Sequence, residues 1–293
     1  MRQIRLAGRP PRFIWPGLVA AWLLFRPAWG SFPPQDVRAS VELENLTWVQ
    51  AEQALKGLDV VLIALGARTK EHGPHLPLKT DYLLAEYLKD RVAAEVPVAV
   101  LPTIPYGYYP SFLEYPGSVS IGAVVFKDLV KDICRSMNGY GARKFYVLNT
   151  GVSTLKPLAE AAEELKKDGL ILRFLDLADV DKALAQGLLK QEGGSHADEA
   201  ETSMMLYIAP QTVDMSKAVK DLDLRPGRKG LTRRPDGPGA YSRTGIWGDP
   251  TLASAEKGRA IVEAAVRVIV GQVRDLIEFK PERTASPAAL GAI

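Results

Sequence analysis

The feature that most constrains the fold is an alternation of short apolar runs with segments of helical periodicity. Apolar runs lie at 60–65, 98–101, 144–148 and 170–175, and each precedes a segment whose apolar side chains recur every three or four residues. Strands that alternate with helices at this spacing predict a parallel sheet, and right-handed crossovers place helices on both of its faces. The sequence therefore predicts an α/β fold with a mostly parallel central sheet.

The helices are predicted from the same periodicity and from their flanking residues. Thr47 is a suitable N-cap for the first helix, and Pro102 is expected to end the second strand. The predicted helices cover residues 43–58, 80–94, 126–140, 155–167, 178–192 and 253–279, with a further helix whose first turn carries His196.

The N-terminus has the pattern of a secretory signal peptide. Four arginines near the start precede a short apolar stretch, and small residues stand at Ala28 and Gly30. We expect residues 1–30 to be removed and the protein to be exported, either periplasmic or secreted. If the segment stays, it would anchor the chain at a membrane. Residues 31–280 are predicted to form one α/β domain, and 281–293 a disordered tail.

Composition limits the classes of partner. The chain has 293 residues, of which 47% are apolar, so it can bury a substantial core. The formal net charge is +3 and the basic residues are scattered, which excludes a nucleic-acid surface. The single cysteine, Cys134, cannot form an internal disulfide. An exported protein of this kind relies on its core or on oligomerisation, and we expect its partner to be a small molecule.

One proline-rich loop carries two of the three histidines. His72 and His75 follow the apolar run 60–65, with Glu71 before them and Asp81 after them. The carboxyl ends of the strands are where open α/β sheets bind ligands. Imidazole and carboxylate groups bind Zn, Mn or Fe, so a metal site is one interpretation. The alternative is a loop whose histidines are merely exposed or hydrogen-bonded, because the spacing matches no common metal motif.

Two further segments carry candidate site residues. His196, Glu199 and Glu201 stand together in the first turn of a predicted helix, where acidic groups also simply compensate the helix dipole. The loop that holds Tyr106 and Tyr108 is rich in aromatic and turn residues. Such a loop suits the rim of a substrate site, and a structural hairpin is the alternative.

Four blocks of this sequence resemble the creatininase (creatinine amidohydrolase) family, in family order over roughly residues 42–275. The blocks are His72-Gly73-Pro74-His75-Leu76-Pro77 with Thr80-Asp81; Tyr106-Gly107-Tyr108 followed by Tyr115-Pro116-Gly117-Ser118; residues 196–203, close to the family's His-Ala-Gly-Glu-x-Glu-Thr-Ser; and residues 245–250 running into 255–258.

The resemblance implies a three-layer α/β/α sandwich, often assembled as a hexamer, with a metal centre at the strand ends. It also implies hydrolysis of a C–N bond in a small cyclic amide or formamide. Members of the family open creatinine or deformylate a pyrimidine intermediate, and others act in peptide-cofactor maturation. This chain would be a divergent exported member, for which creatinine itself is not the expected substrate.

Three positions depart from the family pattern. Lys70 stands where the family has a metal-binding glutamate, Gly151 where it has a turn histidine, and Phe112 where a histidine precedes the aromatic-Pro-Gly block. The stretch from Gly66 to the first loop histidine is one residue longer than usual, so a bulge could bring Glu71 into the ligand position. Loss of the turn histidine favours one metal per subunit.

The resemblance gives each retained residue an expected role. A divalent metal, Zn, Mn or Fe, would activate the attacking water, and a nearby acid/base group would protonate the leaving nitrogen. Two alternatives stay open: a non-catalytic small-molecule-binding protein with an eroded metal site, and a hydrolase of esters or lactones. The expected metal ligands are Glu71, His72 and Asp81, the catalytic residues His196, Glu199 and Glu201, and the substrate-binding residues His75, Tyr106, Tyr108 and Trp247.

Overall fold

The computed structural model describes residues 39–280; the predicted signal peptide and C-terminal tail lie outside the described residues. A parallel sheet forms the centre, with strand order β1-β3-β2-β4-β5. Because all pairs are parallel, the carboxyl ends of β2, β3 and β4 lie at the same edge. The strands are β1 (Val41–Glu42), β2 (Val60–Leu65), β3 (Ala99–Ile104), β4 (Lys144–Asn149) and β5 (Ile171–Phe174).

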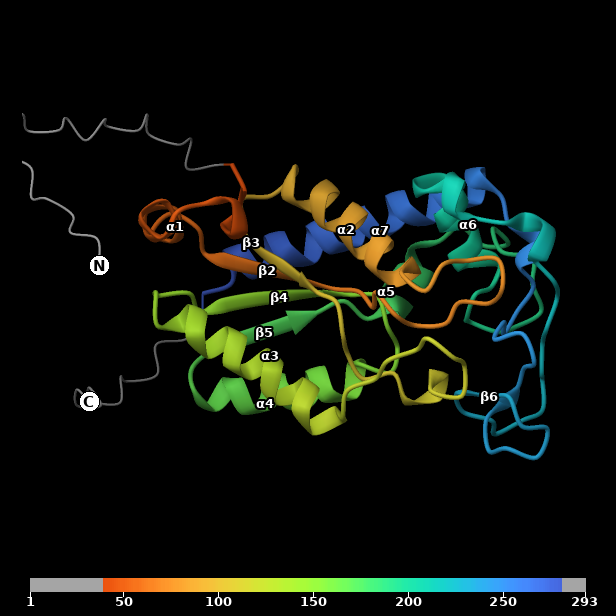
Figure 1. Ribbon diagram of the computed structural model, residues 1–293. Coiled ribbons are helices and arrows are strands. Elements are labelled where there is room, and N and C mark those ends of the chain that lie inside the picture. Colours follow the sequence, from red (N-terminus) through yellow and green to blue (C-terminus); the bar gives the residue numbers. More distant parts are fainter. Residues whose placement is uncertain (1–38, 281–293) are drawn as a thin grey trace, which may run out of the picture. The chain divides into compact units, whose positions relative to one another are not determined.

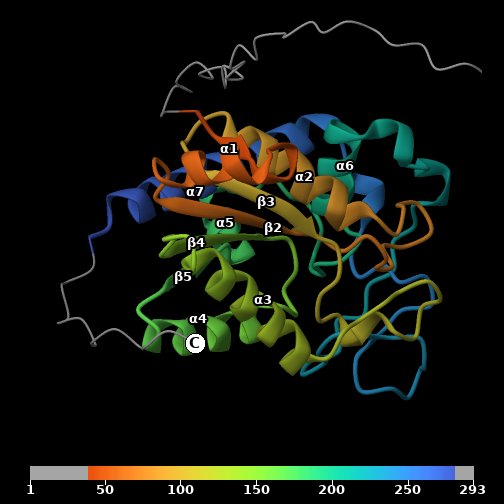
Figure 2. The same cartoon turned by 60° about the vertical axis from the view of Figure 1, so that its left-hand side comes forward.

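Helices cover both faces of this sheet (Figure 1). Helices α2 (Thr80–Ala93) and α7 (Ala255–Glu278) lie on one face, and α3 (Ala123–Asn138) and α4 (Leu155–Lys167) lie on the other, as Figure 2 also shows. The predicted three-layer α/β/α sandwich is therefore confirmed. None of the described helices combines the length and apolarity needed to cross a membrane. The remaining α-helices are α1 (Trp48–Leu55), α5 (Leu177–Ala183) and α6 (Glu199–Ile208).

Two apolar clusters hold the three layers together. All six residues of β2 are buried, and they alternate between the two faces as strand geometry requires. Val60 and Leu62 pack with α2 and α7, whereas Val61 and Ile63 pack with α3 and α4. The sheet is thus a rigid platform for the loops at its carboxyl edge.

A third part of the chain closes over that edge. Strands β6 (Leu231–Thr232) and β7 (Ala240–Tyr241) form a small separate parallel pair. Leu231 and Ala240 are buried against the aromatic rings of Tyr109, Phe112 and Tyr115. This aromatic cluster supports the loops at the carboxyl edge of the sheet. Short 3-10 helices occur at Leu43–Asn45, Pro110–Phe112, Pro210–Thr212, Met215–Lys217 and Pro250–Leu252.

Several predicted boundaries differ from the structure, and three of them have a local explanation. The helix predicted for 178–192 ends at Ala183, and Gly187 beyond it adopts a positive φ of 75° that suits a turn. Strand β3 continues through Pro102. Its pairing with β1 ends at Val100, so β1 needs no backbone N–H from position 102, which proline lacks. Helix α1 is shorter than predicted, but Thr47 caps it with a capping box.

Candidate metal centre

The candidate site lies where the loop after β2 meets the first turns of α2 and α6. The loop carries His72, Asp81 is in the first turn of α2, and Glu201 is in the first turn of α6. His196 is two residues before the N-cap of α6 rather than inside the helix as predicted. The chain thus brings side chains from three separate segments to one edge of the sheet.

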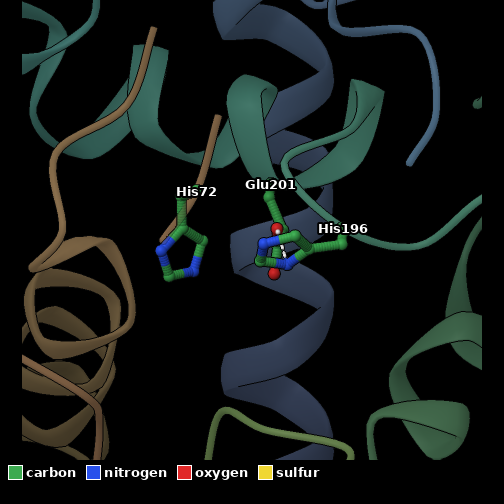
Figure 3. A group of neighbouring side chains, drawn as sticks. All are labelled: His72, His196 and Glu201. Carbon is green, nitrogen blue, oxygen red and sulfur yellow. Dashed lines mark ion pairs between the residues drawn. The ribbon is translucent and has the colours of Figure 1, made fainter. Parts of the chain in front are cut away.

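Three side chains lie close enough to share one metal ion. One ligand atom each from His72, His196 and Glu201 lies within 4.8 Å of the other two. The two imidazole rings are 4.9 Å apart between centroids, and Figure 3 shows the Glu201 carboxylate against the ring of His196. Both histidines are buried and Glu201 is partly buried.

The ring of His72 is held at both of its nitrogens. Nδ1 lies 2.9 Å from the carbonyl oxygen of Lys70, and Nε2 lies 2.9 Å from Oδ1 of Asp81. Because a carbonyl oxygen can only accept, this arrangement places a proton on Nδ1. Nε2 then faces the carboxylate of Asp81 as the nitrogen that can meet a cation, and the backbone carbonyl is the outer partner that orients the ring.

The backbone of His196 is fixed by an antiparallel bridge to Trp247, with N–O distances of 3.2 and 2.8 Å. The side chain points its Nε2 at the carbonyl oxygen of Glu71, 2.9 Å away, and its Nδ1 at Oε2 of Glu201, 3.5 Å away. The ring of Phe112 packs against it at 4.5 Å between centroids. His196 therefore has a proton acceptor at each nitrogen and an apolar wall on one face.

Local geometry at the start of α6 sets the position of Glu201. Asp198 caps the helix by accepting from the backbone N–H groups of Ala200 and Glu201, at 2.9 and 3.0 Å. Ala197 has a φ of 47°, a left-handed conformation that costs an alanine about 1 kcal/mol, and its N–H donates to Oε2 of Glu201. Burial raises the pKa of Glu201, although the charges of His196 and Lys70 oppose this.

Glu71 lies outside the group of three. Its carboxylate accepts from the N–H of Gly73 and lies 3.2 Å from Nε2 of His196. Gly245 faces this carboxylate so closely that a Cβ there would overlap it. Glu71 therefore faces the outer nitrogen of His196, where it orients the ring.

Asp81 is shared between His72 and the buried Lys70, which was predicted from the sequence only as the loss of a metal-binding glutamate. Nζ of Lys70 lies 2.7 Å from Oδ2 of Asp81. Burial alone would raise the pKa of Asp81, but the charges of Lys70 and His72 hold it well below its ordinary value. Burial likewise disfavours the charged lysine, yet Asp81, Glu201 and Glu71 raise the pKa of Lys70. Its place directly before the Glu71-His72 pair was the signal available in the sequence.

His75 joins the loop to α6 from below the site. It is 1% exposed, and its Nε2 lies 2.8 Å from Oγ1 of Thr202, whereas its Nδ1 has no partner among residues 39–280. Burial, with the nearby histidines His72 and His196, lowers the pKa of His75 to about 4. The structure thus places this predicted substrate-binding residue in a buried position.

This buried histidine predicts a pH dependence of stability. The native pKa of His75 is near 4 and the unfolded value is 6.5, so the unfolded chain binds the proton first. The free energy of unfolding should be unaffected by His75 above pH 6.5 and should fall as the pH drops from 6.5 to 4, by on the order of 3 kcal/mol. Urea titrations of the wild type and of His75→Gln should show a smaller acid loss in the variant. Equal losses would contradict the assignment.

The other predicted residues lie around the group of three. Glu199 is fully buried and accepts from the backbone of Lys190 and Gln191, both at 2.7 Å, while it pairs with Lys257 of α7. It joins three segments of the chain, so we keep only Glu201 as the carboxylate of the proposed site.

The aromatic residues predicted to bind substrate differ in exposure. Tyr106 is 44% exposed, and Tyr108 is partly buried against the core beneath α3 and α4. Trp247 packs on the aromatic cluster, and its indole N–H donates to the carbonyl oxygen of Asp223 at 3.0 Å. Trp247 therefore serves His196 through its backbone, and Tyr106 is the one of the three with an open ring.

Comparison with known proteins places the chain in a family. The model of a family described as creatininase, creatinine amidohydrolase, matches residues 44–273. The chain belongs to the creatininase family. The creatinine amidohydrolase of Pseudomonas putida is 28% identical over 83% of this chain and 98% of its own length. The mycofactocin precursor peptide peptidase of Mycolicibacterium smegmatis is 29% identical over 76% of this chain and 87% of its own.

Solved creatininases share the fold. A creatininase with Mn superposes with a TM-score of 0.69 at 28% identity, and a creatininase variant of the Zn-Zn type gives 0.68 at 28% identity. Each superposition covers 80% of this chain and 98% of the creatininase chain. This chain is accordingly a creatininase-family hydrolase of C–N bonds. The predicted family, fold and enzyme class are confirmed.

The residues present fit a divalent metal of the kind seen in the creatininase structures. Two imidazole nitrogens and one carboxylate oxygen converge at the group of three, and this donor set suits Zn, Mn or Fe. His72 and His196 are each oriented by a partner at the outer nitrogen, as metal-binding histidines commonly are. His72, His196 and Glu201 could therefore hold the ion, with Asp81 beside them.

Proposed function

We propose that this protein is a metal-dependent amidohydrolase that cleaves the C–N bond of a small cyclic amide or formamide. The observation that carries the proposal is the convergence of His72, from the loop after β2, with His196 and Glu201, from the start of α6, within 4.8 Å. A divalent ion bound there would polarise the substrate carbonyl and lower the pKa of a water molecule.

The chain's own residues supply the proton chemistry. Hydrolysis adds water to the carbonyl carbon, breaks the C–N bond and requires a proton on the leaving nitrogen. Glu201 lies 3.5 Å from His196, and a carboxylate that holds an ion through one oxygen would keep its second oxygen to take up a proton and pass it on. Glu71 at the outer nitrogen keeps the His196 ring in place while the proton moves. The ring of Phe112, packed against that of His196, limits the entry of water on that side.

A cavity next to Glu201 supports a substrate with an apolar part. It has a volume of about 430 Å³ and is lined by Glu201, by Asn149 and Thr150 at the end of β4, and by apolar residues that include Leu84, Leu175 and Met204. A cavity of this size takes a small molecule. We therefore propose an amide that carries an aliphatic or aromatic substituent.

The test combines a metal count with a substrate screen. Purified protein should contain a divalent metal by emission spectroscopy and should hydrolyse members of a panel of cyclic amides and formamides, with and without apolar substituents. A chelator should remove nearly all turnover, and Zn, Mn or Fe should restore it. No bound metal and no metal-dependent hydrolysis of any amide would overturn the proposal.

A second candidate function has one observation in its favour. Lys70 occupies one oxygen of Asp81, which leaves fewer acceptors for a metal and favours a non-catalytic binding protein on the same fold. Binding of an amide without turnover, unaffected by a chelator, would support this alternative. Cleavage of esters or lactones but not amides would support the esterase reading.

Location and assembly extend the proposal. We infer that residues 1–30 direct export to the periplasm or beyond, and that the mature chain forms a homo-oligomer such as a hexamer. The supporting observations are the signal-peptide pattern of the sequence and the resemblance to the creatininase family. N-terminal sequencing of the exported protein and light scattering would test them.

A further inference from the structure

The carboxylate of Asp81 has a different partner at each oxygen. Oδ1 lies 2.9 Å from Nε2 of His72, on the side of the candidate metal, and Oδ2 lies 2.7 Å from Nζ of Lys70. Both Asp81 and Lys70 are almost fully buried. A carboxylate that bridges two positive positions is the arrangement found where two metal ions share a ligand. Here a side chain of the protein fills one of the positions.

The surroundings of the ammonium group are built for a cation. Nζ of Lys70 lies 4.9 Å from the centroid of the Phe112 ring and 5.5 Å from that of Tyr109, both within the range of cation–π contacts. Tyr109 and Phe112 are themselves buried. Aromatic faces offer no lone pair to a metal ion, so this side of Asp81 suits an ammonium better than a divalent cation.

The three departures from the family pattern meet at this point. Lys70 supplies the ammonium, and Phe112 supplies one of the rings beside it. At Gly151, a Cβ would come within 3.2 Å of the Tyr109 ring, so the missing side chain makes room for the second aromatic face. Residues far apart in sequence thus form one enclosure around the ammonium. This indicates that the three departures act together and are not independent losses of metal ligands.

The charges of the centre fit one divalent ion. Glu71, Asp81 and Glu201 bring three negative charges, and Lys70 returns one positive charge. With neutral imidazoles, one divalent ion balances the remainder, whereas two would leave a buried excess of positive charge. We propose that Lys70 is a built-in cation that takes a metal position on Asp81, so that this chain binds one divalent ion per subunit.

This inference rests on the metal centre of the proposed function, and a metal count separates the two. Full-length wild type, saturated with Mn or Zn and freed of excess ion, should contain one ion per chain by emission spectroscopy. When titrated with Mn, Lys70→Glu should take up a second ion that the wild type does not bind. The glutamate adds an acceptor where the ammonium stood. In the Mn-loaded proteins, electron paramagnetic resonance should show an isolated ion in the wild type and a spin-coupled pair in the variant.

Lys70→Met is the matched control, because it removes the ammonium without adding a ligand, and it should keep one ion. Lys89→Met, which removes the buried lysine of α2 that pairs with Glu86, should also keep one ion. Two ions in the wild type, or one in Lys70→Glu, would overturn the inference and leave the proposed function standing. No ion in the wild type would overturn both. If Lys70→Glu fails to fold, the wild-type count and spectrum decide alone.

Discussion

Replacing His72 with alanine is expected to abolish metal retention and to lower kcat/KM for amide hydrolysis by roughly 10³-fold or more. His72 supplies one of the three converging ligand atoms, and its ring is fully buried between the Lys70 carbonyl and Asp81. Two remaining ligands from His196 and Glu201 would hold an ion weakly. The measurements are metal content after dialysis and initial rates on the best substrate of the panel.

The control must separate a lost ligand from a weakened fold. Leu158 is fully buried in α4, on the face of the sheet away from α2 and α7, and Leu158→Ala should cost about 2–5 kcal/mol of unfolding free energy. That variant should keep its metal and its rate at temperatures where it stays folded. If His72→Ala keeps both its metal and its rate, the centre lies elsewhere. If it loses its metal but binds an amide with unchanged affinity, this would support the alternative of a non-catalytic binding protein.

Four of the five strands of the central sheet could be predicted because each is defined by its own residues, whereas β1 has only two residues and is defined by its pairing with β3. The run Val60–Leu65 is buried on both faces, so it is continuously apolar, and no distant contact is needed to identify it. The end of the helix predicted for 178–192 could not be predicted from its own residues. Its periodicity continues past Ala183, but the backbone of Leu184 is extended and ends the helix, and the turn at Gly187 follows.

The residues of the site could be predicted from their types, but the contacts between their side chains could not. His72, His196 and Glu201 were all named from the sequence, yet Glu201 was grouped with catalytic residues and Glu71 with the ligands. The direction of a carboxylate in a loop depends on contacts that lie more than a hundred residues away, such as that between Glu71 and His196. Lys70 shows the same limit, because its aromatic enclosure forms only when the loops fold together.

Removing the charge of Asp81 should cost about 3–5 kcal/mol of unfolding free energy in metal-free protein, because Asp81→Asn leaves the ammonium of Lys70 buried without its partner. Lys70→Met should cost a similar amount by stranding the carboxylate. The double variant removes both charges, so its cost should fall well short of the sum, with a coupling energy of about 2 kcal/mol or more. Urea titrations in the presence of a chelator give these values.

The pair of Lys89 and Glu86 on α2 is the comparison for this cycle. Their charged atoms are 3.1 Å apart, but the side chain of Glu86 is 32% exposed. Lys89→Met and Glu86→Gln should therefore couple by less than about 1 kcal/mol. Equal coupling energies in the two cycles would mean that the ion pair of Lys70 and Asp81 is no stronger than a partly exposed ion pair. A larger coupling at Asp81 follows from burial, because an isolated charge there has no water to replace its partner.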